Sequence, residues 1–404
     1  MHTVGIICEY NPYHAGHAYQ LAAARRDTGA DVVVAVMSEH TTQRGELAVA
    51  DGYVRAEAAV RAGADVVIGL PFPYSSAPAE FFALSGIRIL DALSVDALHF
   101  GSECGDVAAL SLAAERLYSP EFTESLTAYQ QQHPSCGIMR CREVLYQQTY
   151  GQEIPGGSND LLAMAYLHAL RAEHSAMRPY TVKRTGQAYN DATFRGDVTH
   201  PSATALRQAW ERQGLEALRV QLEPAVFEVF KRASDAECSP LRADALATAL
   251  LSFYRLADVQ KLSQCADMDG GLAERICRAA SEATDLPSLL SLAATRRYTD
   301  GRLRRALLYG ICDVQYDLLT SRPAYVRLLA ANTRGCAYLA SIRKECTLPI
   351  LTKPADLPTS TEAARQRAVE ARLEALLALA LPTPQDAGYW LRKHPFIEKT
   401  QGYT

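Results

Sequence analysis

The sequence predicts an α/β fold, in which an N-terminal doubly wound parallel sheet is followed by a largely helical C-terminal extension. Two observations lead to this prediction. Through residues 1–105, short and nearly uninterrupted apolar runs alternate with segments of helical spacing, as expected when helices cover both faces of a parallel sheet. From about residue 210 to 320 the apolar spacing is helical throughout, in an Ala- and Leu-rich stretch. The ligand of such a sheet is expected beyond the carboxyl ends of its strands.

The N-terminal part supplies strands and helices in alternation. We expect strands at Val4–Cys8, Asp31–Met37, Asp65–Leu70 and Ala97–Phe100. We expect the intervening helices at His17–Asp27, Asp51–Arg61 and Pro78–Leu90. Two further helices, Val107–Leu117 behind a capping Asp106 and Leu161–Ala172, precede one more strand at Tyr180–Val182. Residues 1–200 are therefore predicted to form one domain.

The rest of the chain is predicted to form two further segments. Residues 201–322 form a helical domain, with helices at Leu241–Phe253, Gly271–Glu282, Leu286–Ala293 and Leu307–Val314. Pro323 marks the boundary to an α/β or helical segment at 323–404. There we expect a turn at Arg334-Gly335, a short strand at Leu348–Leu351 and a helix at Ser360–Leu381.

Composition is that of a soluble globular protein. Of the 404 residues 48% are hydrophobic and 21% are charged, and no apolar run approaches the ~18 residues that span a membrane. Ten cysteines without a C-x-x-C pair favour reduced thiols in the cytoplasm, and predict neither a disulfide nor a metal site. The net charge of −4 excludes a uniformly basic nucleic-acid binder, so RNA contact would need a local patch.

The stretch that ends at His17 carries the strongest functional signal. The first predicted strand ends at Cys8, Asn11-Pro12 forces a turn, and helical spacing begins after His17. His14-Ala15-Gly16-His17 therefore lies where a strand gives way to a helix, whose first N–H groups can bind phosphate. Two imidazoles there can donate hydrogen bonds to phosphate oxygens, more strongly if protonated. A lone histidine at this point would be structural, but the spaced pair indicates a phosphate site.

Other polar features follow other strand ends. Gln43-Arg44-Gly45 follows the second strand, Gly101 the fourth and Lys183-Arg184 the strand near residue 180. The two cations are either a triphosphate clamp or an ordinary surface pair. Gly101 either lets a base or ribose pack on bare backbone or is a turn glycine. Asn159 is either the N-cap of the following helix or an amide that contacts a nucleotide.

An arginine cluster in the helical extension is the candidate RNA surface. Residues 296–305 hold five arginines, one aspartate and Tyr298. Such density is common on a solvated helix face, but cationic and aromatic side chains together also suit RNA. The predicted RNA-binding residues are Arg296, Arg297, Arg302, Arg304 and Arg305.

The H-x-G-H pattern at 14–17 resembles the signature of a nucleotidyltransferase superfamily in which the α-phosphorus of a nucleoside triphosphate is attacked. The longer string from Gly5 to Tyr19 resembles the opening of the bacterial tRNA(Met) cytidine acetate ligases. The resemblance covers most of the chain. Its other anchors are Val36-Met37-Ser38, Gln43-Arg44-Gly45, Leu70-Pro71, Phe100-Gly101-Ser102-Glu103, Lys183-Arg184 and Ser202-Ala203-Thr204.

The resemblance implies an enzyme that uses ATP and acetate to acetylate N4 of the wobble cytidine (position 34) of elongator tRNA(Met), releasing AMP and pyrophosphate. It implies catalytic roles for His14 and His17 at the α-phosphate, with Mg²⁺ on the phosphates. The ATP-binding residues that it implies, together with the adjoining cationic site, are Ile7, Cys8, Glu9, Tyr10, Asn11, Pro12, Tyr13, His14, Ala15, Gly16, His17, Ala18, Tyr19, Gln20, Gly101, Asn159, Lys183, Arg184 and Thr185.

The chain departs from this family pattern at three places. The family has Ser-Gly-Asn-Phe after the second strand, an acidic residue before Leu-Pro, and commonly a His before an Asp. Here Glu39-His40, Gly69 and Asn190 stand at those positions. They surround the expected acceptor pocket, so they bear on the acyl and RNA substrates more than on ATP. Two other functions stay open: a small-molecule adenylyltransferase of the same superfamily, and a non-catalytic, ATP-responsive RNA-binding protein.

Overall fold

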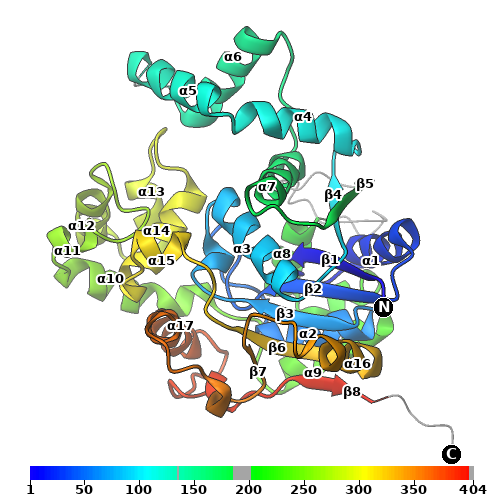
Figure 1. Cartoon of the computed structure of the whole chain (residues 1–404). Coiled ribbons are helices and arrows are strands. Elements are labelled where there is room, and N and C mark those ends of the chain that lie inside the picture. Colours follow the sequence, from blue (N-terminus) through cyan, green and yellow to red (C-terminus); the bar gives the residue numbers. More distant parts are fainter. Residues whose placement is uncertain (134–135, 185–201, 400–404) are drawn as a thin grey trace, which may run out of the picture.

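The structure, a computed structural model of the chain, describes residues 1–133, 136–184 and 202–399. Its centre is a sheet with the strand order β5-β4-β1-β2-β3-β6-β7, and β8 pairs with β6 beside this path (Figure 1). Strands β1 to β5 run parallel, and β6 joins β3 antiparallel. The strands are β1 Thr3–Cys8, β2 Val32–Ser38, β3 Val66–Leu70, β4 Ala97–Ser102, β5 Arg178–Lys183, β6 Val326–Asn332, β7 Ile350–Leu351 and β8 Phe396–Glu398.

Helices cover both faces of the sheet, which confirms the predicted doubly wound α/β class. In β2, Val32 and Val34 join one core and Val33 and Ala35 the other, and all four are fully buried. A strand buried on both faces shows no polar alternation, which is why its apolar run is continuous. One core packs α3 Ala79–Ala92 and α7 Ser158–Ala172 against the sheet. The other packs α1 Ala15–Thr28, α2 Gly52–Arg61, α8 Ala203–Gln213 and α9 Pro224–Asp235.

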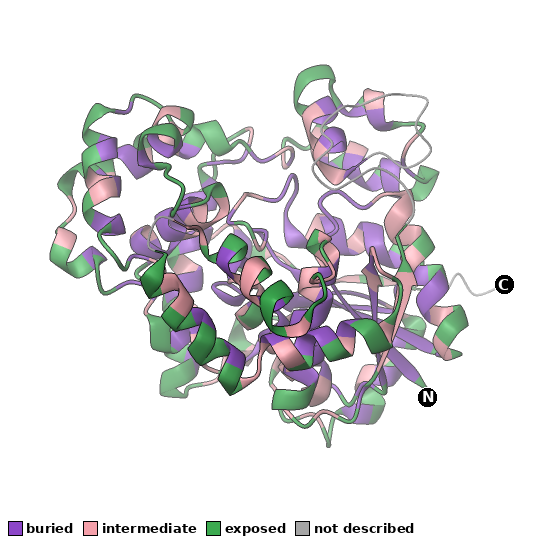
Figure 2. Ribbon diagram, turned by 90° about the horizontal axis from the view of Figure 1, so that it is seen from above, coloured by how far each residue is buried: buried purple, intermediate pink, exposed green. Residues whose placement is uncertain are grey.

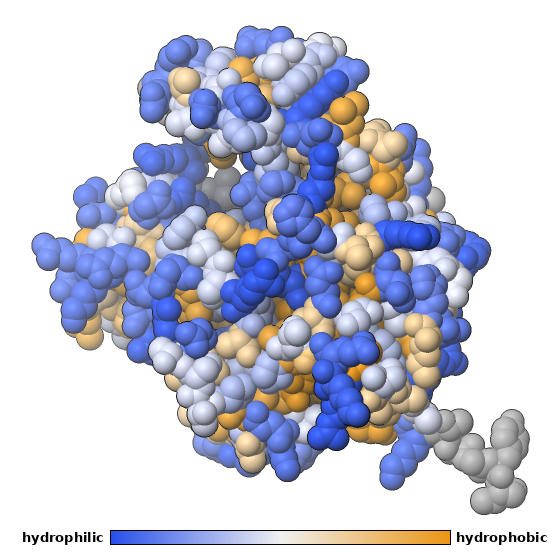
Figure 3. Space-filling model, viewed as in Figure 1, coloured by the Kyte–Doolittle hydropathy of each residue, from blue (hydrophilic) through white to orange (hydrophobic). Residues whose placement is uncertain are grey.

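Two helical lobes extend from this α/β body (Figures 1 and 2). The first helical lobe consists of α4 Val107–Leu117, α5 Pro120–Gln132 and α6 Ile138–Tyr150. The second consists of α10 Ala247–Leu256, α11 Val259–Leu262, α12 Leu272–Glu282, α13 Leu286–Ala293, α14 Asp300–Cys312 and α15 Tyr316–Thr320. On the face that Figure 3 shows, both lobes are largely hydrophilic. Because α14 begins at Asp300 rather than at Leu307, it carries three arginines of the predicted RNA cluster.

The C-terminal segment returns to the N-terminal sheet through β6. The domain boundaries at 200 and 322 stay predictions, but residues 326–332 lie in the same sheet as β1. The predicted turn at Arg334-Gly335 is wrong, because α16 (Thr333–Ile342) begins there with Asn332 as its N-cap. Gly335 serves close packing instead: a Cβ on it would lie 2.0 Å from the carbonyl oxygen of Asp65.

The remaining elements are short, apart from one long helix. Helix α17 spans Thr361–Ala378, close to the predicted range. The 3-10 helices are η1 Tyr74–Ser76, η2 Leu215–Leu218, η3 Ala243–Leu246, η4 Pro354–Asp356 and η5 Trp390–Arg392. No helix within the described ranges is long and apolar enough to cross a membrane. All ten cysteines lie in these ranges as free thiols, and the described side chains form no group of three or more His, Cys, Asp or Glu that could hold a metal ion.

Candidate active site

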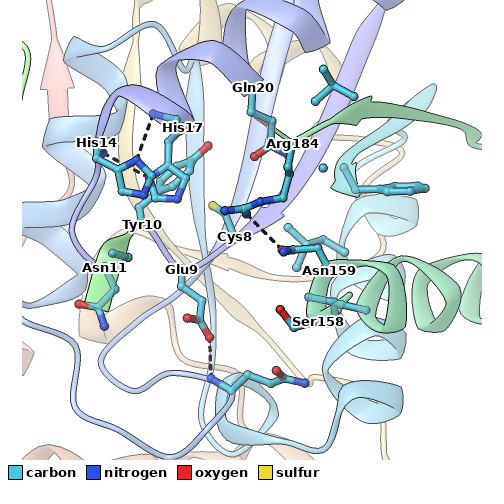
Figure 4. Close-up of a pocket in the computed structure, with 18 of the residues that line it drawn as sticks. Cys8, Glu9, Tyr10, Asn11, His14, His17, Gln20, Ser158, Asn159 and Arg184 are labelled. Carbon is cyan, nitrogen blue, oxygen red and sulfur yellow. Dashed lines mark hydrogen bonds between the residues drawn. The ribbon is translucent and has the colours of Figure 1, made fainter. Parts of the chain in front are cut away.

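The strand order creates a crevice at the carboxyl ends of β1 and β4. Strand β1 lies between β2 and β4, so the chain winds to one side of it and then to the other, and open α/β sheets bind their ligands at such a switch point. A cavity of about 220 Å³ opens there. Its walls come from the loop after β1, the starts of α1, α7 and α8, and the ends of β4 and β5 (Figure 4).

The two histidines of the H-x-G-H pattern close the first turn of α1. His14 is the N-cap, and its Nδ1 accepts a hydrogen bond of 3.0 Å from the backbone N–H of Gly16. Nδ1 of His17 accepts from the backbone N–H of His14 at 3.3 Å, so the two rings form a reciprocal capping box. They are stacked, with centroids 3.9 Å apart. Because Nδ1 is the acceptor in both, each neutral ring carries its hydrogen on Nε2 and donates from there.

The structure favours the neutral form of His17. Burial lowers the pKa of His17 well below its usual value, and the neighbouring His14 and Arg184 lower it further. A protonated imidazole, which would donate more strongly, is therefore disfavoured at this position. In its neutral form His17 can donate from Nε2, and the positive charge of the cavity comes from its cationic side chains.

The opposite wall is built on the first turn of α7. The N-cap of α7 is Gly157, so the interpretation of Asn159 as an N-cap is wrong. Glu103, just after β4, accepts bonds from the backbone N–H groups of Asn159 and Asp160, and from Nδ2 of Asn159 at 2.6 Å. These bonds outweigh the effect of partial burial and lower the pKa of Glu103. Gly157 makes room for this carboxylate, since a Cβ there would lie 2.1 Å from its Oε2.

Arg184 is held over the cavity by this arrangement. Its Nη1 donates to Oδ1 of Asn159 at 3.2 Å, so the amide of Asn159 is fixed between an anion and a cation (Figure 4). The stem of Arg184 crosses Gly101, whose added Cβ would lie 3.3 Å from Cγ of Arg184. Glu103 thus orients Arg184 through Asn159. Gly101, which has no side chain, leaves room for the stem of the arginine to cross it.

The third wall follows β1. Oε1 of Glu9 accepts a hydrogen bond of 2.7 Å from the backbone N–H of Gln43, which belongs to the loop after β2 (Figure 4). Arg207 of α8 donates to the carbonyl oxygen of Asn11 at 2.9 Å and pairs with Glu46 at 3.3 Å. Burial raises the pKa of Glu9, against the opposing effects of the Gln43 N–H and of Arg207. These bonds fix the two loops to each other at the edge of the cavity.

A buried arginine ties together the strand ends beneath the site. Arg55 of α2 is fully buried. It donates to the carbonyl oxygens of Ala50 at 2.9 Å and Ser38 at 2.8 Å, and also to those of Glu9 and Glu39. Burial lowers its pKa to about 10, so it stays charged at neutral pH. One side chain therefore satisfies four backbone acceptors where β1 and β2 end, and it fixes the spacing of those strand ends.

Comparisons with known proteins agree with this architecture. The chain matches the family model described as HIGH Nucleotidyl Transferase over residues 1–387. A tRNA(Met) cytidine acetate ligase of Syntrophotalea carbinolica is 36% identical over 370 residues, which cover 87% of this chain and 85% of that protein. This chain belongs to the tRNA(Met) cytidine acetate ligase family. The predicted family and the predicted enzyme class, a ligase, are confirmed.

Other members of the ligase family support the same assignment. The Caldicellulosiruptor saccharolyticus protein of the same name is 36% identical over 352 residues, 85% of this chain and 86% of that protein. Among solved structures, apo Thermotoga maritima TmcAL has a TM-score of 0.92 and 29% identity, covering 99% of this chain and 100% of that one. The same protein bound with alpha-thio ATP has a TM-score of 0.89 and 27% identity, with the same coverage.

The structure of this ligase brings most of the residues predicted to bind ATP to the cavity wall. They are Ile7, Cys8, Glu9, Tyr10, Asn11, His14, Gly16, His17, Tyr19, Gln20, Gly101, Asn159, Lys183 and Arg184. Pro12, Tyr13, Ala15 and Ala18 do not line it. Tyr13 is buried, with its ring centroid 5.6 Å from that of His17. Thr185 lies outside the described residues. Binding of ATP by these side chains stays a prediction.

Ten further residues line the cavity of the ligase and are not among those predicted ligands. They are Gln43, Arg44, Phe82, Phe100, Ser158, Leu162, Tyr166, Val182, Ala203 and Arg207. Gln43 and Arg44 carry a usable signal, because they follow the end of a predicted strand. Phe82 and Tyr166 give no sequence signal for a site, since their apolar spacing indicates only the core face of a helix.

The arginine cluster of the ligase lies on the second helical lobe and does not line the cavity. Arg302 and Arg305 are mostly buried and pair with Asp269 and Asp267, and Arg304 pairs with Asp300. The two remaining arginines, at 296 and 297, are exposed. RNA contact by the cluster stays a prediction. The pairing shows that three of its five guanidinium groups already have carboxylate partners within the lobe.

Proposed function

We propose that this chain is an ATP-dependent ligase that activates acetate as acetyl-adenylate and transfers the acetyl group to N4 of the wobble cytidine of elongator tRNA(Met). The observation that carries the proposal is the reciprocal pair of His14 and His17, which fixes two Nε2–H donors on one wall of the cavity while Arg184 occupies the other. The curated relatives bear the name of this activity, and the Thermotoga maritima protein binds an ATP analogue.

In the first step a carboxylate oxygen of acetate attacks the α-phosphorus of ATP, and pyrophosphate leaves. Negative charge grows on the α-phosphoryl oxygens and on the leaving group. Two fixed N–H donors and the guanidinium of Arg184 suit this charge, because they need no reorganisation during the reaction. Acetate is already an anion, so this step requires no base from the protein.

ATP enters as its magnesium complex, with the ion held by the phosphates. Glu9 is the one carboxylate among the described residues that line the cavity, and one of its oxygens accepts the Gln43 N–H. Mg²⁺ commonly takes one or two carboxylates and completes its shell with phosphate oxygens and water. In this proposal the ion belongs to the nucleotide substrate and is coordinated by its phosphate oxygens and by water.

In the second step the exocyclic amine of cytidine attacks the acetyl carbonyl, and AMP leaves. We place the entry of the acceptor on the side of the loop that contains Gln43 and Arg44, because this lining loop lies against the second helical lobe, which carries the predicted RNA-binding arginines. That loop contacts the second helical lobe: a Cβ on Gly45 would lie 2.6 Å from the backbone nitrogen of Arg305. An RNA held on the second helical lobe would thus approach the cavity past this loop.

The test is incubation of the protein with MgATP, labelled acetate and tRNA(Met). Label on the RNA supports the proposal. Transfer of AMP to a small phosphorylated acceptor would instead indicate an adenylyltransferase, and ATP binding without turnover would indicate a non-catalytic RNA-binding protein. His17→Ala should lower the acetylation rate by ~10²–10³, the usual effect of removing one such donor. His394→Ala, at an exposed histidine, is the matched control. A wild-type rate in His17→Ala would overturn the catalytic assignment.

A further inference from the structure

The transfer step releases one proton from the cytidine amine, and a group in the site must accept it. When the cytidine amine bonds to the acetyl carbon and the bond from that carbon to the phosphate oxygen breaks, the nitrogen gives up one proton. The exocyclic amine of cytosine is not basic, so the proton leaves as the C–N bond forms, and a positioned acceptor speeds this event. The following inference rests on the proposed function and names that acceptor.

Most polar groups in the cavity are unsuited to receive a proton. Nδ1 of His14 and Nδ1 of His17 already accept backbone N–H groups, and Nε2 of each ring carries the hydrogen. Lysine and arginine side chains have no acceptor. Burial raises the pKa of the Cys8 thiol and of the Tyr166 phenol well above their usual values. Both therefore stay protonated.

Glu9 is left as the proton acceptor among the described lining residues. In Figure 4 its carboxylate lies below the histidine pair and to the left of Asn159, on the wall of the same cavity. The Gln43 N–H holds Oε1 at 2.7 Å and thereby fixes the direction of the carboxylate. Oε2 makes no hydrogen bond to any described residue, and it is not sealed off in the protein interior. One oxygen anchors the group, and the other faces the cavity.

The position of Glu9 is on the acceptor side of the site. It bonds to the same loop that contacts α14 through Gly45, and Arg207 and Glu46 bridge that loop to the chain after β1. The histidines and Arg184 occupy the phosphate side. A base that serves the incoming amine, but not the anionic acetate, is needed on the acceptor side.

We propose that Glu9 is the general base of the transfer step. The cytidine nitrogen forms its bond to the acetyl carbon, Oε2 of Glu9 takes one proton from that nitrogen, and AMP leaves with the electron pair of the broken C–O bond. Glu9 then returns the proton to water. Burial of the carboxylate raises its pKa, which makes it a stronger base than an exposed glutamate, while Arg207 and Arg55 keep its anionic form accessible.

The experiment measures the two half-reactions separately in Glu9→Gln. Acetate-dependent exchange of pyrophosphate into ATP reports acetyl-adenylate formation, and label on tRNA(Met) reports transfer. Glutamine keeps an oxygen for the Gln43 N–H but loses the base. We expect exchange to stay near the wild-type rate and transfer to fall by ~10²–10⁴. Glu9→Asp should recover part of the transfer rate, and Glu124→Gln, at an exposed glutamate of α5, is the control.

Each outcome decides the matter. Equal loss of exchange and transfer in Glu9→Gln would mean that Glu9 serves nucleotide binding, and it would overturn the assignment of a base. Unchanged transfer would also overturn it, and would indicate that the departing phosphate takes the proton. The absence of acetate-dependent exchange in the wild type would instead refute the proposed function itself, before the role of Glu9 arises.

Discussion

The carboxylate of Glu39 lies directly over the Cα of Gly69. A Cβ on Gly69 would be 2.1 Å from Oε1 of Glu39, so any side chain at that position would displace the carboxylate. The two residues lie near the ends of neighbouring strands, since Glu39 follows Ser38, Gly69 precedes Leu70, and Ser38 pairs with Leu70 where β2 and β3 end. Oε2 of Glu39 bonds to Arg327 of β6 at 2.6 Å, and that arginine also contacts Glu370 and Glu374 of α17.

This relationship joins two departures of the sequence from its family pattern. The resemblance implies a glycine after the serine that ends the second strand, and an acidic residue before Leu-Pro. Here Glu39 and Gly69 stand in exchanged positions. In this chain one carboxylate and one gap lie together between the strands, and Arg327 has a carboxylate partner from the residue after β2.

A double-mutant cycle tests this exchange. Gly69→Glu should destabilise the protein, because two carboxylates would compete for one space beside Arg327. Glu39→Gly should destabilise it because Arg327 loses a buried partner. The double variant should be more stable than the sum of the two effects predicts, by ~0.5–3 kcal/mol. Urea unfolding midpoints give the three values. Strict additivity would show that the two positions do not share this space.

Removal of Arg55 should destabilise the protein at the carboxyl ends of β1 and β2, where this side chain binds backbone carbonyl oxygens. Arg55→Met removes the donor from three buried carbonyl oxygens, at ~1–3 kcal/mol each when unsatisfied, and from the partly buried one of Glu9, so we expect a loss of at least about 3 kcal/mol in the free energy of unfolding. Arg61→Met is the matched control on the same helix, where Arg61 makes a partly exposed pair with Glu57 worth ~0–1 kcal/mol. Equal losses in the two variants would contradict the role given to Arg55.

The fold was largely predictable from local patterns, and the exceptions have physical causes. The valines of β2 form one continuous run because both faces are covered, and such a run is visible without any tertiary information. Strand β6 has an apolar centre preceded by Arg327, and its antiparallel pairing with β3 joins residues far apart in the sequence, which no local pattern encodes. The dipeptide Arg334-Gly335 is typical of a turn. The structure shows instead that a side chain at position 335 would clash with the carbonyl oxygen of Asp65.

The site was predictable where one short stretch builds it. His14 and His17 lie in the same helical turn, so their spacing alone indicates their chemistry. The chain from Glu103 through Asn159 to Arg184 brings three distant segments together, and only the structure shows that Asn159 orients an arginine. The structure is likewise needed to show that the carboxylate of Glu39 occupies the space that Gly69 leaves free.

Arg184 gives a prediction on nucleotide affinity that rests on the proposed function. Arg184→Gln should weaken ATP binding by ~10–100-fold, as for the loss of a charged hydrogen bond, and should change AMP binding much less. Asn159→Ala should also weaken ATP binding more than AMP binding, because Arg184 then loses its hydrogen bond of 3.2 Å to Asn159. Isothermal titration with ATP and AMP separates the effects. Arg178→Gln, an exposed arginine at the other end of β5, is the control. An equal loss for ATP and AMP would place Arg184 away from the outer phosphates.

The buried cluster around Arg327 should make stability depend on pH through Glu370. Burial raises the pKa of Glu370 to about 7 from 4.5, with Glu39 and Glu374 acting in the same direction and Arg327 opposing. The folded protein then binds this proton more tightly than the unfolded chain. Its contribution to stability is complete below pH 4.5 and is lost as the pH rises through about 7.

Glu370→Gln isolates this contribution. The variant lacks the titrating group, so its free energy of unfolding should decline less than that of the wild type between pH 4.5 and 7. It should also be less stable at every pH, because an amide does not accept all three bonds from Gln366, Tyr325 and Arg327. The slope against pH, and not the absolute stability, is therefore the informative quantity. Parallel pH profiles for the two proteins would show that Arg327 holds Glu370 ionised throughout this range.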